Sequence, residues 1–157
     1  MSEGLSIRPA GESDWPEILA LANRAVPGSP NNNRKWLAER QNFDSTSWAQ
    51  RRYVAITRNS IEGFAAFEEG PQSHHFRIYL IMTDENLKSC VAAILINRLL
   101  RDLADFNATR IWARADSKRK TFYHLFTALG LDFAHYCTAK HGSEDIVMER
   151  DLSTPLI

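Results

Sequence analysis

Residues 76–103 of this chain read FRIYLIMTDENLKSCVAAILINRLLRDL, and the rest of the sequence is arranged around this stretch. Its first part has an apolar residue at every second position, namely Phe76, Ile78, Leu80 and Met82. This period predicts a strand with one buried face. After a polar turn, apolar residues recur every four positions at Val91, Leu95, Leu99 and Leu103. They predict an amphipathic helix of about five turns. A helix start that follows a strand presents unpaired N–H groups that can hold an anion, and an ordinary strand–helix unit without a ligand is the alternative.

The composition is that of a globular protein in one domain, residues 1–157. Apolar residues make up 44% of the chain and charged residues 24%, and nineteen residues of each sign give zero formal charge. Zero charge argues against nucleic acid or an anionic membrane as a partner. The sequence shows no secretory leader, no membrane-spanning apolar run and no paired CxxC motif. These features predict free thiols and a cytoplasmic location. No zinc-ligand cluster, Walker-type loop or Ser–His–Asp spacing is present, so no metal is expected.

Period and turn signals divide the remaining chain into short elements. Further strands are expected over residues 5–9, 53–56, 61–67, 109–115, 133–138 and 145–149. One helix is expected after a capping box formed by Asp14 and Glu17, ending at Val26, a second over residues 34–41, and a third from Ser117 to Leu129. The central strand, long helix and next strand form a crossover and are expected to be parallel, between antiparallel meanders. This order predicts an α/β (α+β) fold, a single mixed, mostly antiparallel, twisted sheet with helices on both faces.

Three segments in this order resemble the GNAT superfamily of acyl-CoA-dependent N-acyltransferases. They are RYVA at 52–55 with IEGFA at 61–65, which match a family hairpin, and FYHLFTALGL at 122–131, which matches the late helix. The resemblance covers roughly Ser6 to Leu152. It implies a GNAT-like fold with acetyl-CoA as co-substrate.

The family's cofactor motif, [QR]xxGx[GA], falls on residues 87–92 of this chain. Leu87 stands where Arg or Gln is usual, and Cys90 stands where the first glycine is usual. Asp84 replaces a common proline and adds a negative charge, whereas Lys88 offers a positive one. The cofactor-binding residues that the resemblance implies are Leu80 and Met82, by backbone pairing, and Lys88, Ser89, Cys90, Val91, Ala92 and Ala93, around the pyrophosphate.

Acetyl transfer to an amine needs a base for the amine proton and a donor for the departing thiolate. Among the carboxylates and histidines near the central strand, Glu68 is the first choice for the base, because carboxylates at this edge face the acceptor cleft in the family. The family's usual tyrosine position falls on Phe126, so Tyr123, one helical turn earlier, is the expected donor. An amphipathic residue at the helix edge is the alternative for Tyr123.

Two functions follow from these features. The first is an N-acetyltransferase that acetylates a primary amine of a small molecule or peptide by direct attack in a ternary complex. The second is a non-catalytic GNAT-fold module for binding or dimerisation, which the departures at Leu87, Cys90 and Phe126 favour. Homodimers are common in the family, so the resemblance also implies a second copy of this chain as a partner.

Overall fold

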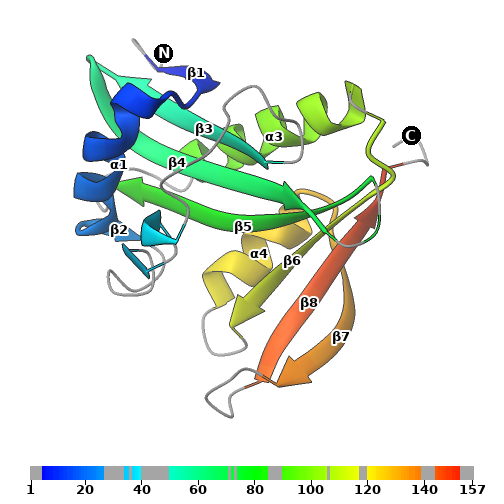
Figure 1. Ribbon diagram of the computed structural model, residues 1–157. Coiled ribbons are helices and arrows are strands. Elements are labelled where there is room, and N and C mark those ends of the chain that lie inside the picture. The colour runs from blue at the N-terminus through cyan, green and yellow to red at the C-terminus, as the bar shows by residue number, and fades with distance from the viewer. Residues whose placement is uncertain are drawn as a thin grey trace.

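The computed structural model describes residues 5–26, 34–35, 37–39, 50–70, 72, 74–84, 90–105, 107–116, 120–138 and 144–152. Their strands form one sheet in the order β1-β3-β4-β5-β6-β8-β7, and β2 pairs with β5 (Figure 1). The strands are β1 (Ser6–Pro9), β2 (Ala25–Val26), β3 (Gln50–Thr57), β4 (Ser60–Glu69), β5 (His75–Asp84), β6 (Arg110–Asp116), β7 (Asp132–Thr138) and β8 (Glu144–Asp151). Among these strands only β5 and β6 pair in parallel. The predicted mixed, mostly antiparallel sheet and its parallel crossover are confirmed.

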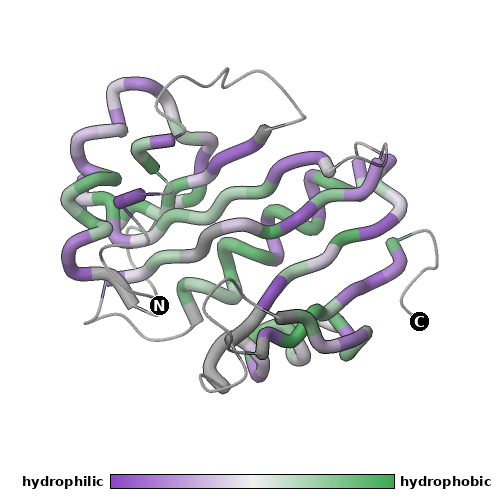
Figure 2. Tube along the Cα trace, turned by 60° about the horizontal axis from the view of Figure 1, so that its bottom comes forward, coloured by the Kyte–Doolittle hydropathy of each residue, from purple (hydrophilic) through white to green (hydrophobic). Residues whose placement is uncertain are grey.

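Helices lie on both faces of the sheet, as predicted. The described helices are the 3-10 helix η1 (Glu12–Asp14), α1 (Trp15–Ala22), α3 (Cys90–Asp105) and α4 (Lys120–Ala128). One apolar core joins α3 and α4 to the sheet, and a second joins α1 to the opposite face. Residues 34–35 and 37–38 are helical within the predicted second helix, and Leu37 is fully buried in the α1-side core. Figure 2 shows the apolar parts of α3 running beside the central strands. Within the described residues, no helix is both long and apolar enough to span a membrane.

A bulge in β5 changes which face its side chains occupy. Ala66 of β4 pairs with Leu80, but the next residue, Phe67, pairs with Ile78, so Tyr79 is an extra residue in β5. An extra residue reverses the alternation of side chains beyond it. Ile78 therefore packs in the α3-side core and Met82 in the α1-side core. The expectation that Phe76, Ile78, Leu80 and Met82 share one buried face is wrong.

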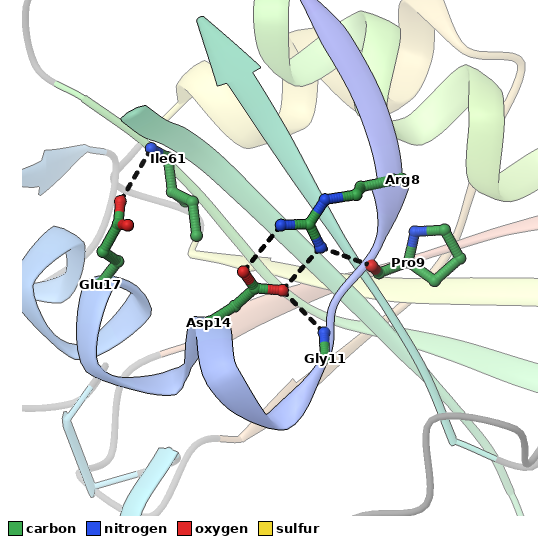
Figure 3. Close-up of polar contacts among 6 residues, drawn as sticks. All are labelled: Arg8, Pro9, Gly11, Asp14, Glu17 and Ile61. Carbon is green, nitrogen blue, oxygen red and sulfur yellow. Dashed lines mark hydrogen bonds and ion pairs between the residues drawn. The ribbon is translucent and has the colours of Figure 1, made fainter. Parts of the chain in front are cut away.

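The start of α1 is held by a network that differs from the predicted capping box (Figure 3). The Asp14 carboxylate accepts a hydrogen bond of 2.7 Å from the backbone N–H of Gly11 and is clamped by both terminal nitrogens of Arg8, at 2.7 and 2.8 Å. The Arg8 guanidinium holds the pKa of the Asp14 carboxyl below its usual value. Glu17 instead accepts a hydrogen bond of 3.1 Å from the N–H of Ile61. These contacts tie α1 to β1 and β4.

Two features position α3 on the sheet. A Cβ added to Gly63 of β4 would lie 3.0 Å from Cδ1 of Leu95, so the glycine lets the helix approach closely. On the same face, the hydroxyl of the fully buried Tyr53 donates a hydrogen bond to Asp102 of α3. Burial, and then this hydrogen bond, raise the pKa of Tyr53 to about 12. The helix that begins at the predicted anion site is therefore fixed along its length.

Candidate active site

β5 and β6 separate after a short paired segment. They pair from His75 with Arg110 to Ile78 with Ala113, and no further β5–β6 partners follow, although the described strands run on to Asp84 and Asp116. At Thr83 and Asp84 this edge of β5 pairs with β2 instead, because Thr83 also pairs with Gly63 of β4 on the other edge. The bulged Tyr79 lies at the point of separation. Figure 1 shows the two strands diverging, with α4 beside the gap. Between Ile78 and Thr83, one edge of β5 thus presents backbone N–H and C=O groups to a gap instead of a strand.

The predicted cofactor residues occupy two parts of this region. Leu80 and Met82 lie on the section of β5 beyond the separation, where the pantetheine pairing was expected. Four others, Cys90, Val91, Ala92 and Ala93, are the first four residues of α3. Backbone N–H groups in the first turn of a helix have no acceptor within that helix. The residues just before Cys90 lie outside the described part of the chain. The side chains of Val91 and Ala92 are buried in the core, so these two residues offer a ligand only their backbone. Lys88 and Ser89, like Leu87, lie outside the described residues.

The negative charge of Asp84, at the end of β5, is offset by a residue far away in the sequence. Nε of Arg24, just after α1, lies 2.6 Å from Oδ2 of Asp84, and this carboxylate is only about one-tenth exposed. Arg24 also donates to the carbonyl of Ile61 at 3.3 Å. The two-residue strand β2 pairs with the last two residues of β5 and brings this arginine into place. The negative charge that Asp84 adds at the end of β5 is therefore paired with Arg24.

Glu68 lies on the α1-side face of the sheet, level with the residue of β5 just before the last β5–β6 pair. It sits opposite Arg77 of β5, which in turn sits opposite Trp112 of β6. Oε2 of Glu68 lies 3.9 Å from the guanidinium of Arg52, whose side chain is 1% exposed. Because Phe76 and Ile78 point into the α3-side core, Arg77 between them points to the opposite face with Glu68. The candidate base thus lies in a row of charged and aromatic side chains beside the gap.

Tyr123 lies on α4, on the opposite side of the sheet from Glu68. It is half-buried and packs against the α3-side core, and its carbonyl accepts a hydrogen bond of 2.8 Å from the Thr127 hydroxyl. Phe126 is 3% exposed and belongs to that core. The two candidate groups therefore lie on opposite faces of the sheet.

A hollow opens on the α1-side face next to this row. One part, of about 300 Å³, is lined by Gly70, Gln72, His75 and Trp112. A second part, of about 460 Å³, shares two of these residues and is otherwise polar; its lining is Gln72, His75, Thr109, Arg110, Glu149 and Asp151. Within the described part of the chain, no group of three or more potential metal ligands was found.

Sequence reasoning missed three parts of this site, which are β2, the pair of Arg24 with Asp84, and the bulge at Tyr79. Arg24 and Asp84 are sixty residues apart, so no local pattern connects them. The bulge left one signal. Arg77 and Tyr79 alternate with the apolar residues Phe76, Ile78 and Leu80, yet the run Leu80 to Met82 is apolar without alternation. A break in period is typical of a strand that changes its buried face.

The overall fold is that of the GNAT acetyltransferases. An acetyltransferase of the GNAT family from Streptococcus pneumoniae superposes with a TM-score of 0.72 at 14% identity, over 94% of this chain and 98% of that one. The ribosomal-protein-S18-alanine N-acetyltransferase from Escherichia coli gives 0.75 at 17% identity, over 97% and 96%. An aminoglycoside 6'-acetyltransferase type Ii gives 0.77 at 14% identity, over 97% and 99%. No protein-family model matches the sequence, and no curated protein is similar to it in sequence.

Proposed function

We propose that this chain, as one domain over residues 1–157, is an acetyl-CoA-dependent N-acetyltransferase of the cytoplasm. Its acceptor is a primary amine of a small molecule or peptide, which attacks directly in a ternary complex. The observation that carries the proposal is the separation of β5 from β6 after Ile78. The helix α3 is the next described element of the chain after β5. The gap offers strand-like backbone to an extended pantetheine, and the helix start offers N–H groups to a pyrophosphate.

The residues present fit that co-substrate. Its pyrophosphate would be held by the backbone N–H groups of Cys90 to Ala93, aided by the helix dipole. Because Arg24 offsets the charge of Asp84, the end of β5 does not oppose an anion as strongly as an isolated carboxylate would. Leu80 and Met82 would align the pantetheine through their backbone. Lys88 and Ser89, which lie outside the described residues, are also proposed to bind the co-substrate.

Acetyl-CoA supplies a thioester, and the chain supplies the proton transfers. The amine forms the new C–N bond to the acetyl carbon, and the C–S bond breaks. Glu68, directly or through a water, takes the proton that the amine loses. The Tyr123 hydroxyl donates a proton to the sulfur of the departing thiolate. Backbone N–H groups at the bulge of β5 would stabilise the negative charge on the carbonyl oxygen during attack.

The first test is calorimetric titration of the purified protein with acetyl-CoA and, separately, CoA. The proposal predicts a dissociation constant between about 1 μM and 1 mM, the usual range for enzyme substrates. Absence of binding at millimolar ligand would contradict the proposal and favour the non-catalytic module. That second function is favoured by one observation, the burial of Phe126 in the core at the position where the family usually has its tyrosine.

A further inference from the structure

Two exposed aromatic side chains lie together on β7, the strand at one edge of the sheet. Within the described part of the chain, β7 pairs only with β8 and is the last strand of the sheet (Figure 1). Phe133 is 48% exposed and Tyr136 is 59% exposed, and their ring centroids lie 5.0 Å apart in an edge-to-face contact. Aromatic side chains are enriched where proteins meet other molecules. These two residues are called the β7 aromatic pair below.

A bulge in β7 places both rings on the same face of the sheet. Phe133 pairs with Met148 of β8, and Tyr136 pairs with Ile146. The partners are two residues apart in β8, whereas the rings are three residues apart in β7, because Ala134 is an extra residue. Without the bulge, residues three apart in a strand would point to opposite faces. The bulge therefore gathers two aromatic rings on one face, where they remain exposed.

The edge of β7 carries little charge that would repel a second copy of this chain. From Phe133 to Thr138 the strand contains no Lys, Arg, Asp or Glu, although charged side chains commonly protect edge strands. Its carboxylate, Asp132, is at the first position of the strand. Two copies of an edge strand that pair across a two-fold axis run antiparallel. The two Asp132 side chains then lie at opposite ends, about 20 Å apart for full-length pairing, which exceeds the Debye length of about 10 Å.

The area of the β7 aromatic pair suits a weak dimer. An aromatic side chain has about 200 Å² of surface, so each ring exposes about 100 Å², and two copies together expose about 400 Å² of ring surface. Asp132, Ala134 and His135 are also exposed, and they add to the contact when two copies of β7 lie edge to edge. The total approaches the lower limit of about 1,000 Å² for a specific interface. Interfaces near this limit are transient.

We propose that β7 is the interface of a homodimer, in which two copies of the strand pair antiparallel across a two-fold axis. An axis perpendicular to the sheet keeps the same face of each copy on the same side, so the four rings meet on one face of a continuous sheet. In the strand order, β8 lies between β7 and the strand β6 that borders the gap. The gap of each copy is therefore outside this interface, and the inference does not depend on the proposed acetyltransferase function.

The test is sedimentation velocity of the purified protein without acetyl-CoA, from about 1 μM to about 200 μM. We expect an equilibrium between monomer and dimer with a Kd of about 1–100 μM. Phe133→Ser combined with Tyr136→Ser removes both rings and should raise this Kd at least about tenfold. Tyr136→Lys changes only the more exposed ring and should also raise the Kd, because the two-fold axis brings the two added charges close together.

Ile94→Ser is the matched control, because Ile94 is the other exposed large hydrophobic residue among those described and lies on α3, where it is 39% exposed. It should keep the wild-type Kd, and circular dichroism should show the wild-type fold for every variant. A protein that stays monomeric at about 200 μM, or a dimer whose Kd neither β7 variant changes, would overturn the inference. An equal loss of dimer in Ile94→Ser would also overturn it. Acetyl-CoA binding is measured separately, so each of these outcomes leaves the proposed function standing.

Discussion

The pair of Arg24 and Asp84 makes a quantitative prediction about acetyl-CoA binding. In Arg24→Gln the carboxylate of Asp84, about one-tenth exposed, loses its guanidinium partner at 2.6 Å. At an assumed separation of about 10 Å, a carboxylate that has lost this guanidinium repels each phosphate charge by about 1.7 kcal/mol at an effective dielectric constant of about 20. Screening by salt reduces this to about 1 kcal/mol. Two pyrophosphate charges then weaken binding by about 2 kcal/mol, which is about thirtyfold in Kd.

Titration calorimetry with acetyl-CoA measures this change directly. Arg24→Gln should also lower the free energy of unfolding by about 1–3 kcal/mol, because a buried charged acceptor loses a partner. Folding must therefore be checked by circular dichroism at the titration temperature. The double variant Arg24→Gln with Asp84→Asn removes the charge itself and should recover most of the affinity. If Arg24→Gln binds acetyl-CoA as tightly as the wild type, the reasoning about the end of β5 is refuted.

Three further predictions concern the scaffold and the chemistry. Gly63→Ala crowds Leu95 and should lower the free energy of unfolding by about 1–3 kcal/mol, as measured by urea unfolding. It should also weaken acetyl-CoA binding, as measured by titration calorimetry. Unchanged values of both would contradict close packing at this glycine. Tyr53 has its pKa raised to about 12, so it adds stability that is complete below pH 10 and lost as pH rises toward 12, a change of about 3 kcal/mol. Tyr53→Phe removes the hydroxyl that donates to Asp102. The difference in free energy of unfolding between the wild type and this variant should therefore become smaller from about pH 10 to about pH 12. A difference that stays constant over this range would contradict the raised pKa of Tyr53. Tyr123→Phe should lower kcat by about ten- to a hundredfold with little change in acetyl-CoA affinity, and full activity would assign the proton donor elsewhere.

Much of the fold was readable from the sequence because local patterns carry it. The periods of two and of about four around residues 76–103, and the turn residues between elements, predicted the order of strands and helices. The parallel pairing of β5 with β6 followed from the crossover rule, since two strands joined by a long helix pair in parallel. The roles of Glu68 and Tyr123 stay predictions.

Tertiary structure alone decided the details of the site. The sequence by itself determined which segments are strands and helices, because burial of one face imposes a period on neighbouring residues. It did not determine the bulge at Tyr79, which arises where β5 must match the register of β4. It also did not determine the pairing of Arg24 with Asp84 or the stacking of Arg77 on Trp112. Each of these contacts joins residues distant in the chain, and such contacts exist only after the sheet has formed.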